Sequence, residues 1–360
     1  MIKVDRSVGA RWSALRHRFQ TPLLAVMGGL VIGGLIMWLA GYDPIEAYSA
    51  MLNGAFAGRR LINLVSMLNR AGPIVGMGLA AAIAFRAGFF NIGGEGQLVL
   101  GSVIAALVTL YLPLPDALRI PFVFIAAAGV AGGYAWLAAY FQFRFQVPLL
   151  ISTLLLNYPA RFLASYLVSY PFRDIPSGMN QSELIPEAAR LPKLIAGTQL
   201  HLGVIIIFAL VLLAVFVLYR TVAGYEVRML GLNARFAQYG GISLRATGYR
   251  VMFLSGALAG VVGAIEVLAI HYRYVDGMLV TPLYAWTGIM AALLANTNPI
   301  GVLVAGLFFS AVQTGGAGME RGAEVPRELA RVIQAIIIML VAASAGFRTS
   351  REHGEEATRG

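Results

Sequence analysis

The chain has 360 residues, of which 59% are hydrophobic and only 12% charged, far more apolar than a soluble domain. It contains no cysteine, which excludes disulfides, thiol chemistry and cysteine-based metal sites. The net charge of +10 does not indicate nucleic-acid binding, because the basic residues lie in short segments between apolar runs, where they act as topology signals.

The apolar runs predict an all-α, polytopic integral membrane helix bundle of about ten transmembrane helices, since each crossing needs about 20 apolar residues. The first run, Pro22–Gly41, is expected to be a retained span and not a cleaved signal peptide. The next segment, Gly41–Arg60, is partly amphipathic and is expected at the outer surface. The further spans are expected at Leu61–Phe85, Gln97–Leu112, Ile120–Phe141, Leu149–Tyr170, Leu202–Tyr219, Val251–Ile270, Pro282–Ala295, Ile300–Gly315 and Glu328–Ala345.

The distribution of lysine and arginine supports cytoplasmic N- and C-termini, because these residues are more frequent in the segments expected inside. The predicted organisation is a cytoplasmic N-terminal segment at 1–21, a transmembrane domain at 22–345 with a cytoplasmic loop at 220–250, and a cytoplasmic tail at 346–360.

A polar and glycine-rich break separates two apolar runs at Arg86–Gln97 and reads R-A-G-F-F-N-I-G-G-E-G-Q. Backbone groups freed by such a break go unsatisfied in lipid, so the break must lie in protein or beside water. The ionisable Glu95 strengthens that interpretation, and we expect the segment to help build a translocation pathway. The residues expected to shape the break are Arg86, Gly93, Gly94 and Gly96.

The runs Pro282–Ala295 and Ile300–Gly315 are each shorter than a crossing and predict a re-entrant pair or a broken helix. Two polar segments also stand out. The outer one, Pro171–Gln199, either meets a delivery protein or simply covers the bundle. In the inner one, Glu226–Tyr239 predicts a single short helix ended by Gly240 and Gly241, which either docks on a partner or lies on the membrane surface.

The four histidines show no metal-ligand spacing, and most lie near span ends, which favours solvated or interfacial positions and no metal site. They are His17, His201, His271 and His353.

Four stretches together resemble the permease subunits of bacterial ABC importers of the ribose and branched-chain amino acid type, most closely the purine-nucleoside branch. They are G-L-A-A-A-I-A-F-R-A-G-F-F-N-I-G-G-E-G-Q (Gly78–Gln97), S-T-L-L-L-N-Y-P-A (Ser152–Ala160), R-M-L-G-L-N-A-R-F-A-Q-Y-G-G-I (Arg228–Ile242) and V-P-R-E-L-A-R-V-I-Q-A-I-I-I (Val325–Ile338). The chain departs from the family pattern at Phe236, where a small residue is usual, and at Pro159, which is expected to kink its span.

The resemblance implies that Arg228–Ile242 contains a coupling helix seated on a separate ATP-hydrolysing subunit, which would hold ATP and magnesium. This chain cannot supply the ATP hydrolysis itself, because its only lysines, Lys3 and Lys193, follow no phosphate-binding loop. We expect it to need no cofactor and to carry no catalytic residue. The residues matched to the coupling motif are Arg228, Gly231, Leu232, Asn233, Ala237, Gly240, Gly241 and Ile242.

The pathway candidates are Asn91, Glu95, Gln97 and Asn157, whose side chains can hydrogen-bond the hydroxyls and base edges of a nucleoside. Buried amides also join helices to one another, so a purely structural role stays open. Glu95 is expected to pair with Arg86, because a neutral nucleoside offers no charge to balance a carboxylate.

The resemblance therefore implies a nucleoside or sugar-like importer permease in the bacterial inner membrane that works by alternating access. Its expected partners are the ATPase, a second and preferably non-identical permease, and a substrate-binding lipoprotein. A self-contained secondary transporter or channel is the alternative, for which Glu266 is the one further strong mid-span acid. A membrane enzyme is disfavoured, because no His pair, acidic pair or G-x-S-x-G motif is found.

Overall fold

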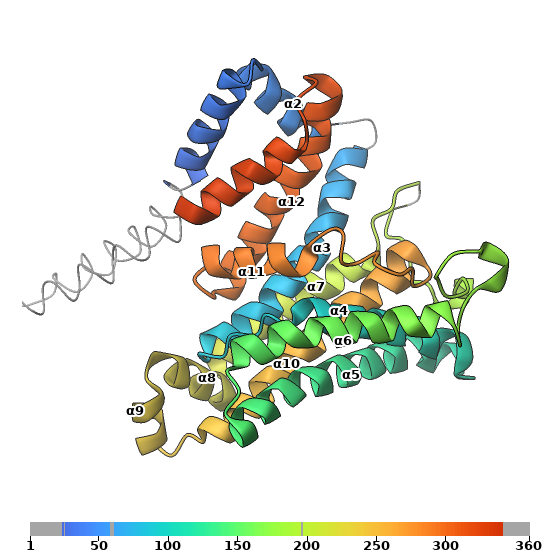
Figure 1. The fold of residues 1–360 in the computed structure, drawn as a ribbon, viewed down its shortest axis with the longest axis vertical. Coiled ribbons are helices and arrows are strands. Elements are labelled where there is room, and N and C mark those ends of the chain that lie inside the picture. Colours follow the sequence, from blue (N-terminus) through green and yellow to red (C-terminus); the bar gives the residue numbers. More distant parts are fainter. Residues whose placement is uncertain (1–23, 25, 58–60, 196, 341–360) are drawn as a thin grey trace, which may run out of the picture. The chain divides into compact units, whose positions relative to one another are not determined.

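The computed structural model describes residues 24, 26–57, 61–195 and 197–340. The predicted cytoplasmic segment 1–21 and tail 346–360 lie outside the described residues. The fold is all-α: apart from helices, the described residues form only two isolated β-bridges. They fall into two compact units, one within Met1–Leu64 and Ala311–Gly360 and the other within Val65–Ser310. Figure 1 shows the helices of each unit.

The first unit contains the helix Val26–Leu39, α2 (Pro44–Phe56), the C-terminal part of α12 (Pro299–Gly322) and a helix at 328–340. The Asp43 side chain caps α2 by accepting the Ile45 and Glu46 backbone N–H groups. Glycines let α2 and α12 touch through their backbones: a Cβ atom added to Gly54 would lie 2.6 Å from the Cα atom of Gly318.

The second unit is built around a long three-helix core. Its helices, in chain order, are α3 (Ile62–Arg86, from Val65), α4 (Gly94–Tyr111), α5 (Asp116–Phe145), α6 (Leu149–Ser169), α7 (Leu202–Arg220), α8 (Val222–Leu232), α9 (Ala234–Tyr239), α10 (Leu244–Glu266) with the π-helix η4 (Val267–His271), α11 (Tyr284–Leu294) and the start of α12. The chain also forms two 3₁₀ turns, η2 (Ile175–Ser177) and η3 (Glu187–Ala189).

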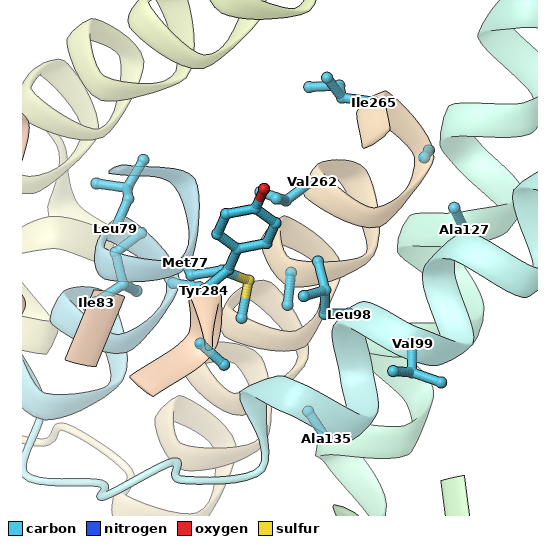
Figure 2. Packing of buried hydrophobic residues seen from close by; sticks show 14 of the residues in the cluster. Met77, Leu79, Ile83, Leu98, Val99, Ala127, Ala135, Val262, Ile265 and Tyr284 are labelled. Carbon is cyan, nitrogen blue, oxygen red and sulfur yellow. The ribbon is translucent and has the colours of Figure 1, made fainter. Parts of the chain in front are cut away.

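The core of this unit is formed by α4, α5 and α10, which pack closely against one another. Side chains of α3, α4 and α10 gather with Tyr284 of α11 in one buried cluster (Figure 2). A glycine seam on α10, formed by Gly256, Gly260 and Gly263, lies directly on backbone atoms of α5 and α4. Lipid supplies no hydrophobic force between helices, so such close backbone packing is what holds a membrane bundle together.

Six helices of the described residues are long and apolar enough to cross a membrane. They are Ile62–Arg86, Gly94–Tyr111, Asp116–Phe145, Leu202–Arg220, Leu244–His271 and Pro299–Gly322. The polytopic helical fold is therefore confirmed, while the count of about ten spans stays a prediction. The Leu149–Tyr170 run also forms one continuous helix, α6, which passes through Pro159.

The expectation of two short apolar helices near the C-terminus is half right. α11 has 11 residues and is too short to cross a bilayer, as predicted. α12 has 24 residues, so the predicted end at Gly315 is wrong. The glycines after Thr314 look like a helix end in the sequence, but they serve the close packing of α12 on α2 instead.

The outer segment 171–199 is folded onto the bundle. Its backbone pairs with the chain after α10, since Ser182 N–H donates to the Tyr274 carbonyl at 2.9 Å and Ile185 N–H to the Tyr272 carbonyl at 2.8 Å. The Arg190 guanidinium also lies over the Tyr272 ring, 4.6 Å from its centroid. These contacts support the covering role of this segment.

Candidate functional site

The break between α3 and α4 is held together by side chains of α6. α3 ends at Arg86, one residue after the predicted end, and α4 begins at Gly94, three residues before the predicted start at Gln97. The Asn157 Oδ1 atom accepts Gly96 N–H at 2.8 Å, and its Nδ2 atom donates to the Ile92 carbonyl at 3.2 Å. Thr153 Oγ1 accepts Ile92 N–H at 3.2 Å. α6 thus satisfies backbone groups that the break would otherwise leave unpaired in the membrane.

A second buried network closes the break from the side of α10. Asn91 Nδ2 donates to both Gln97 Oε1 and Ser255 Oγ at 2.9 Å, while Gln97 Nε2 donates to Asn91 Oδ1 at 3.0 Å. Gly93 N–H donates to Asn91 Oδ1 at 3.1 Å. All four pathway candidates, Asn91, Glu95, Gln97 and Asn157, are buried. The amides of Asn91, Gln97 and Asn157 already form hydrogen bonds with protein groups. These bonds favour a structural role over direct contact with a solute.

Glu95 makes different contacts from those expected. One carboxylate oxygen lies 3.5 Å from Arg161 Nη1 on α6, and the other accepts the Trp286 Nε1–H of α11 at 3.1 Å. The predicted pair between Glu95 and Arg86 is therefore wrong. Glu95 belongs to the first turn of α4, which directs it toward α6 and α11. Arg86 instead donates to Thr297 Oγ1 at 3.4 Å.

Neither Arg161 nor Trp286 is among the site residues predicted from the sequence. Arg161 carries a usable signal, because an arginine inside a predicted span is rare and usually functional. Trp286 carries none, since it is 191 positions from Glu95 and tryptophan is common in membrane helices.

The predicted helix Glu226–Tyr239 is two helices, α8 and α9, so the expectation of a single helix is wrong. Asn233 separates them: it is extended, at φ −157° and ψ 104°, and its Oδ1 atom accepts Phe236 N–H at 3.0 Å. Because the Asn233 side chain caps α9, the backbone at Asn233 takes an extended conformation and α8 ends there. Gly241, at φ +84°, ends the segment as predicted. Leu232, Phe236 and Tyr239 are exposed on this α8–α9 segment.

Replacing Asn233 by alanine is expected to destabilise α9 by about 1 kcal/mol, because the Phe236 N–H loses its side-chain acceptor. Limited proteolysis of the assembled protein should show faster cleavage within 234–242. Asn233→Asp keeps an acceptor oxygen and should be cleaved at the normal rate. Equal cleavage of all three proteins would show that the cap does not hold the segment.

The α8–α9 segment contacts the break directly. Any side chain at Gly231 would collide with the carbonyl oxygen of Arg86, the last residue of α3. The guanidinium groups of Arg86 and Arg228 also lie over the same ring, that of Tyr219, at 5.7 and 5.6 Å from its centroid. Residues predicted for the break and for coupling therefore meet at one junction at the end of α7, which we call the Tyr219 junction.

Within the part of the chain that the structure describes, no group of His, Asp and Glu side chains could hold a metal ion. His201 lies at the N-terminus of α7, near the end of a span as expected, but it is buried, so the expectation of a solvated side chain is wrong for it. His271 is partly exposed, with Nε2 3.6 Å from the Glu266 carboxylate. His17 and His353 lie outside the described residues.

Comparison with known proteins places these features in a family. Residues 63–342 match the family model described as branched-chain amino acid transport system / permease component. The chain is 32% identical over 333 residues to the guanosine ABC transporter permease protein NupP of Bacillus subtilis, covering 91% of this chain and 94% of that protein. It is 32% identical over 344 residues to the glucose ABC transporter permease protein TsgB13 of Haloferax volcanii, covering 92% and 89%.

A third relative is the nucleoside ABC transporter permease protein NupB of Lactococcus lactis subsp. cremoris, 30% identical over 331 residues, covering 89% of this chain and 90% of that protein. No solved structure matches the chain significantly. The family match covers more than half of the chain, and the relatives are matched over nearly their full lengths. The chain therefore belongs to the branched-chain amino acid transport system / permease component family, as a membrane-spanning permease component of an ABC transporter.

Proposed function

We propose that this permease imports nucleosides across the plasma membrane by alternating access, driven by ATP hydrolysis on a partner subunit. Two of the three relatives above are named for guanosine or nucleosides. The motifs around Arg86–Gln97 and Arg228–Ile242 resemble the same purine-nucleoside branch. The glucose permease is as similar as the guanosine permease, so glucose is the competing substrate.

The observation that carries the mechanism is the Tyr219 junction. In the proposed cycle the α8–α9 segment docks on the ATPase through its exposed apolar side chains, which include Leu232 and Phe236. Movement of α8 would displace the break directly, because Gly231 lies against the Arg86 backbone without an intervening side chain. Closely packed atoms transmit displacement better than a flexible linker does.

The residues of the break would move together and so transmit this displacement to α4. The hydrogen bonds of Asn91, Gln97 and Asn157 tie the turn to α4, α6 and α10. These three residues act in this scheme as positioning residues. Glu95 is also buried, but it is the one pathway candidate that joins the partly exposed side chains of Arg161 and Trp286, and we place it beside the pathway for that reason.

The remaining parts of the assembly follow from the same proposal. ATP and magnesium bind the ATPase, a second and non-identical permease completes the pathway, and a substrate-binding lipoprotein delivers the solute at the outer face. The domain limits at 22–345, the cytoplasmic termini and the ten spans belong to this proposal.

Uptake of labelled guanosine by cells that produce the complete transporter tests the proposal. We expect ATP-dependent uptake that excess unlabelled adenosine reduces and excess glucose does not. A complex with an ATPase unable to hydrolyse ATP is the control and should take up no guanosine. Uptake of glucose but not guanosine would transfer the assignment to sugars, and accumulation by the permease alone in liposomes would refute the ABC mechanism.

A further inference from the structure

Arg161 is a partly exposed charged side chain deep within α6, which has 21 residues, enough by length for the predicted crossing, although α6 is not one of the six helices that are also apolar enough. Arg161 lies eight residues before the end of α6 at Ser169, about 12 Å along the helix axis. Its side chain is 44% exposed in the isolated chain. An arginine at that depth is too costly to expose to lipid, so this face of α6 borders water or protein.

Arg161 is paired with an acidic side chain of α4, which in turn binds a side chain of α11. Glu95, in the first turn of α4, lies 3.5 Å from its guanidinium and accepts the indole N–H of Trp286 from α11. The positive end of the α4 dipole also favours a carboxylate at this position. Three separate helices thus bring a donor, an acceptor and an aromatic ring together.

The surface of α6 next to Arg161 carries further aromatic and hydrogen-bonding side chains. Tyr158 and Ser165 lie three residues before and four residues after Arg161, on the same face of α6. Tyr158 is exposed, and Ser165 Oγ donates to the Asp276 carboxylate at 2.8 Å. Trp286 itself is 38% exposed. A surface of this kind offers aromatic area together with hydrogen-bonding groups.

We propose that Arg161, Glu95 and Trp286 form a solute-binding site on the pathway-facing surface of this chain. The assignment rests on the proposed import function and names the residues that would recognise the solute. Glu95 and Arg161 neutralise each other, so the site as a whole suits an uncharged solute. Indole packs on the flat base of a nucleoside, while the guanidinium donates to base or sugar oxygens and the carboxylate accepts from N–H or hydroxyl groups.

Transport kinetics of the complete complex test the aromatic member. Trp286→Leu removes the ring and should raise the KM for guanosine about ten-fold with a smaller change in maximal rate. Trp286→Phe keeps a ring and should raise the KM much less. If Trp286→Leu leaves the KM unchanged while wild-type protein imports guanosine, the binding role of Trp286 is refuted.

The charged pair is tested by matched variants. Arg161→Gln leaves the Glu95 carboxylate without its cation and should reduce uptake strongly. Glu95→Gln leaves the Arg161 guanidinium without its anion and should also reduce uptake strongly. The double variant Arg161→Gln/Glu95→Gln restores neutrality and should recover part of the maximal rate but not the affinity for guanosine. Full recovery of the KM would show that the pair is structural only.

The natural absence of cysteine allows a direct test of water access. Tyr158→Cys should react with a charged, water-soluble thiol reagent, and guanosine should slow the reaction. Leu212→Cys on α7 is the matched control, because Leu212 is 67% exposed on the most apolar of the six long helices and should not react. The complex with the unchanged chain gives the background from its partner subunits.

The possible outcomes test the proposed site and the proposed substrate independently of each other. If the wild-type complex imports guanosine but guanosine does not protect Tyr158→Cys, the site is refuted and the import function stands. If the complex imports glucose and glucose alone protects, the nucleoside assignment fails and the site stands. A Tyr158→Cys protein that does not react in any state refutes the site.

Discussion

Replacing Gly231 by alanine is expected to reduce solute uptake at least ten-fold while the permease remains in the membrane. The new Cβ atom would collide with the Arg86 carbonyl oxygen, a backbone atom that cannot rotate away. Overpacking of this kind costs about 1–3 kcal/mol, and here the cost is relieved if α8 moves away from the break. Uptake assays with quantification of the permease by immunoblot give the measurement.

Gly72→Ala is the matched control for this prediction. Gly72 lies on α3, the same helix whose end Gly231 touches, and a Cβ atom added there meets nothing within 4 Å. Alanine also favours a helix by up to about 1 kcal/mol relative to glycine, so the control protein should be at least as stable as wild type. Equal loss of uptake in both variants, or normal uptake in Gly231→Ala, would remove the Tyr219 junction from the coupling route.

Asn157→Leu is expected to lower the thermal stability of the permease sharply and to reduce its amount in the membrane. Leucine has a similar size but leaves Gly96 N–H and the Ile92 carbonyl without their partners. Each unsatisfied buried group costs about 1–3 kcal/mol. A thermal unfolding assay in detergent, followed by any residual uptake, distinguishes the structural role from a pathway role.

Leu155→Ala, two residues earlier on an exposed part of α6, is the control and should change stability little. If Asn157→Leu folds normally but takes up guanosine with a greatly raised KM, the side chain contacts solute and the structural interpretation is wrong. The two variants together therefore decide between the alternatives that the sequence leaves open.

The break at Arg86–Gln97 could be predicted from sequence because its signals are local. Glycine, an ionisable residue and flanking apolar runs all lie within a few positions. Its supports could be predicted only in part. The sequence singles out Asn157 and leaves a helix-joining role open, but it does not give the partners of Asn157 or the contact with Ser255, because these residues lie far apart in the chain. The wrong pairing of Glu95 with Arg86 has the same origin: nearness in the sequence suggested a partner, whereas the fold supplies Arg161 and Trp286.

Helix ends show the same division. Hydropathy placed α6 and α7 within a residue or so of their observed bounds. The end of α12 was missed, because glycines that end a helix in water also serve close packing in a membrane bundle. The division of α8 from α9 is not predicted from the sequence, because it depends on the single residue Asn233. Asparagine also occurs within helices, and only the extended backbone at this position makes it a cap.

The glycine seam of α10 limits how this bundle can deform during transport. Helices whose main chains touch at Gly256, Gly260 and Gly263 have no side chains there to repack, so α4, α5 and α10 should travel as one block. Bending must then occur where the chain leaves helical geometry. Left-handed residues gather at such places around α11, at Tyr272, Leu283, Asn296 and Thr297. Spin labels on α5 and α10 would then keep a constant separation through the cycle, while labels placed across α11 would not.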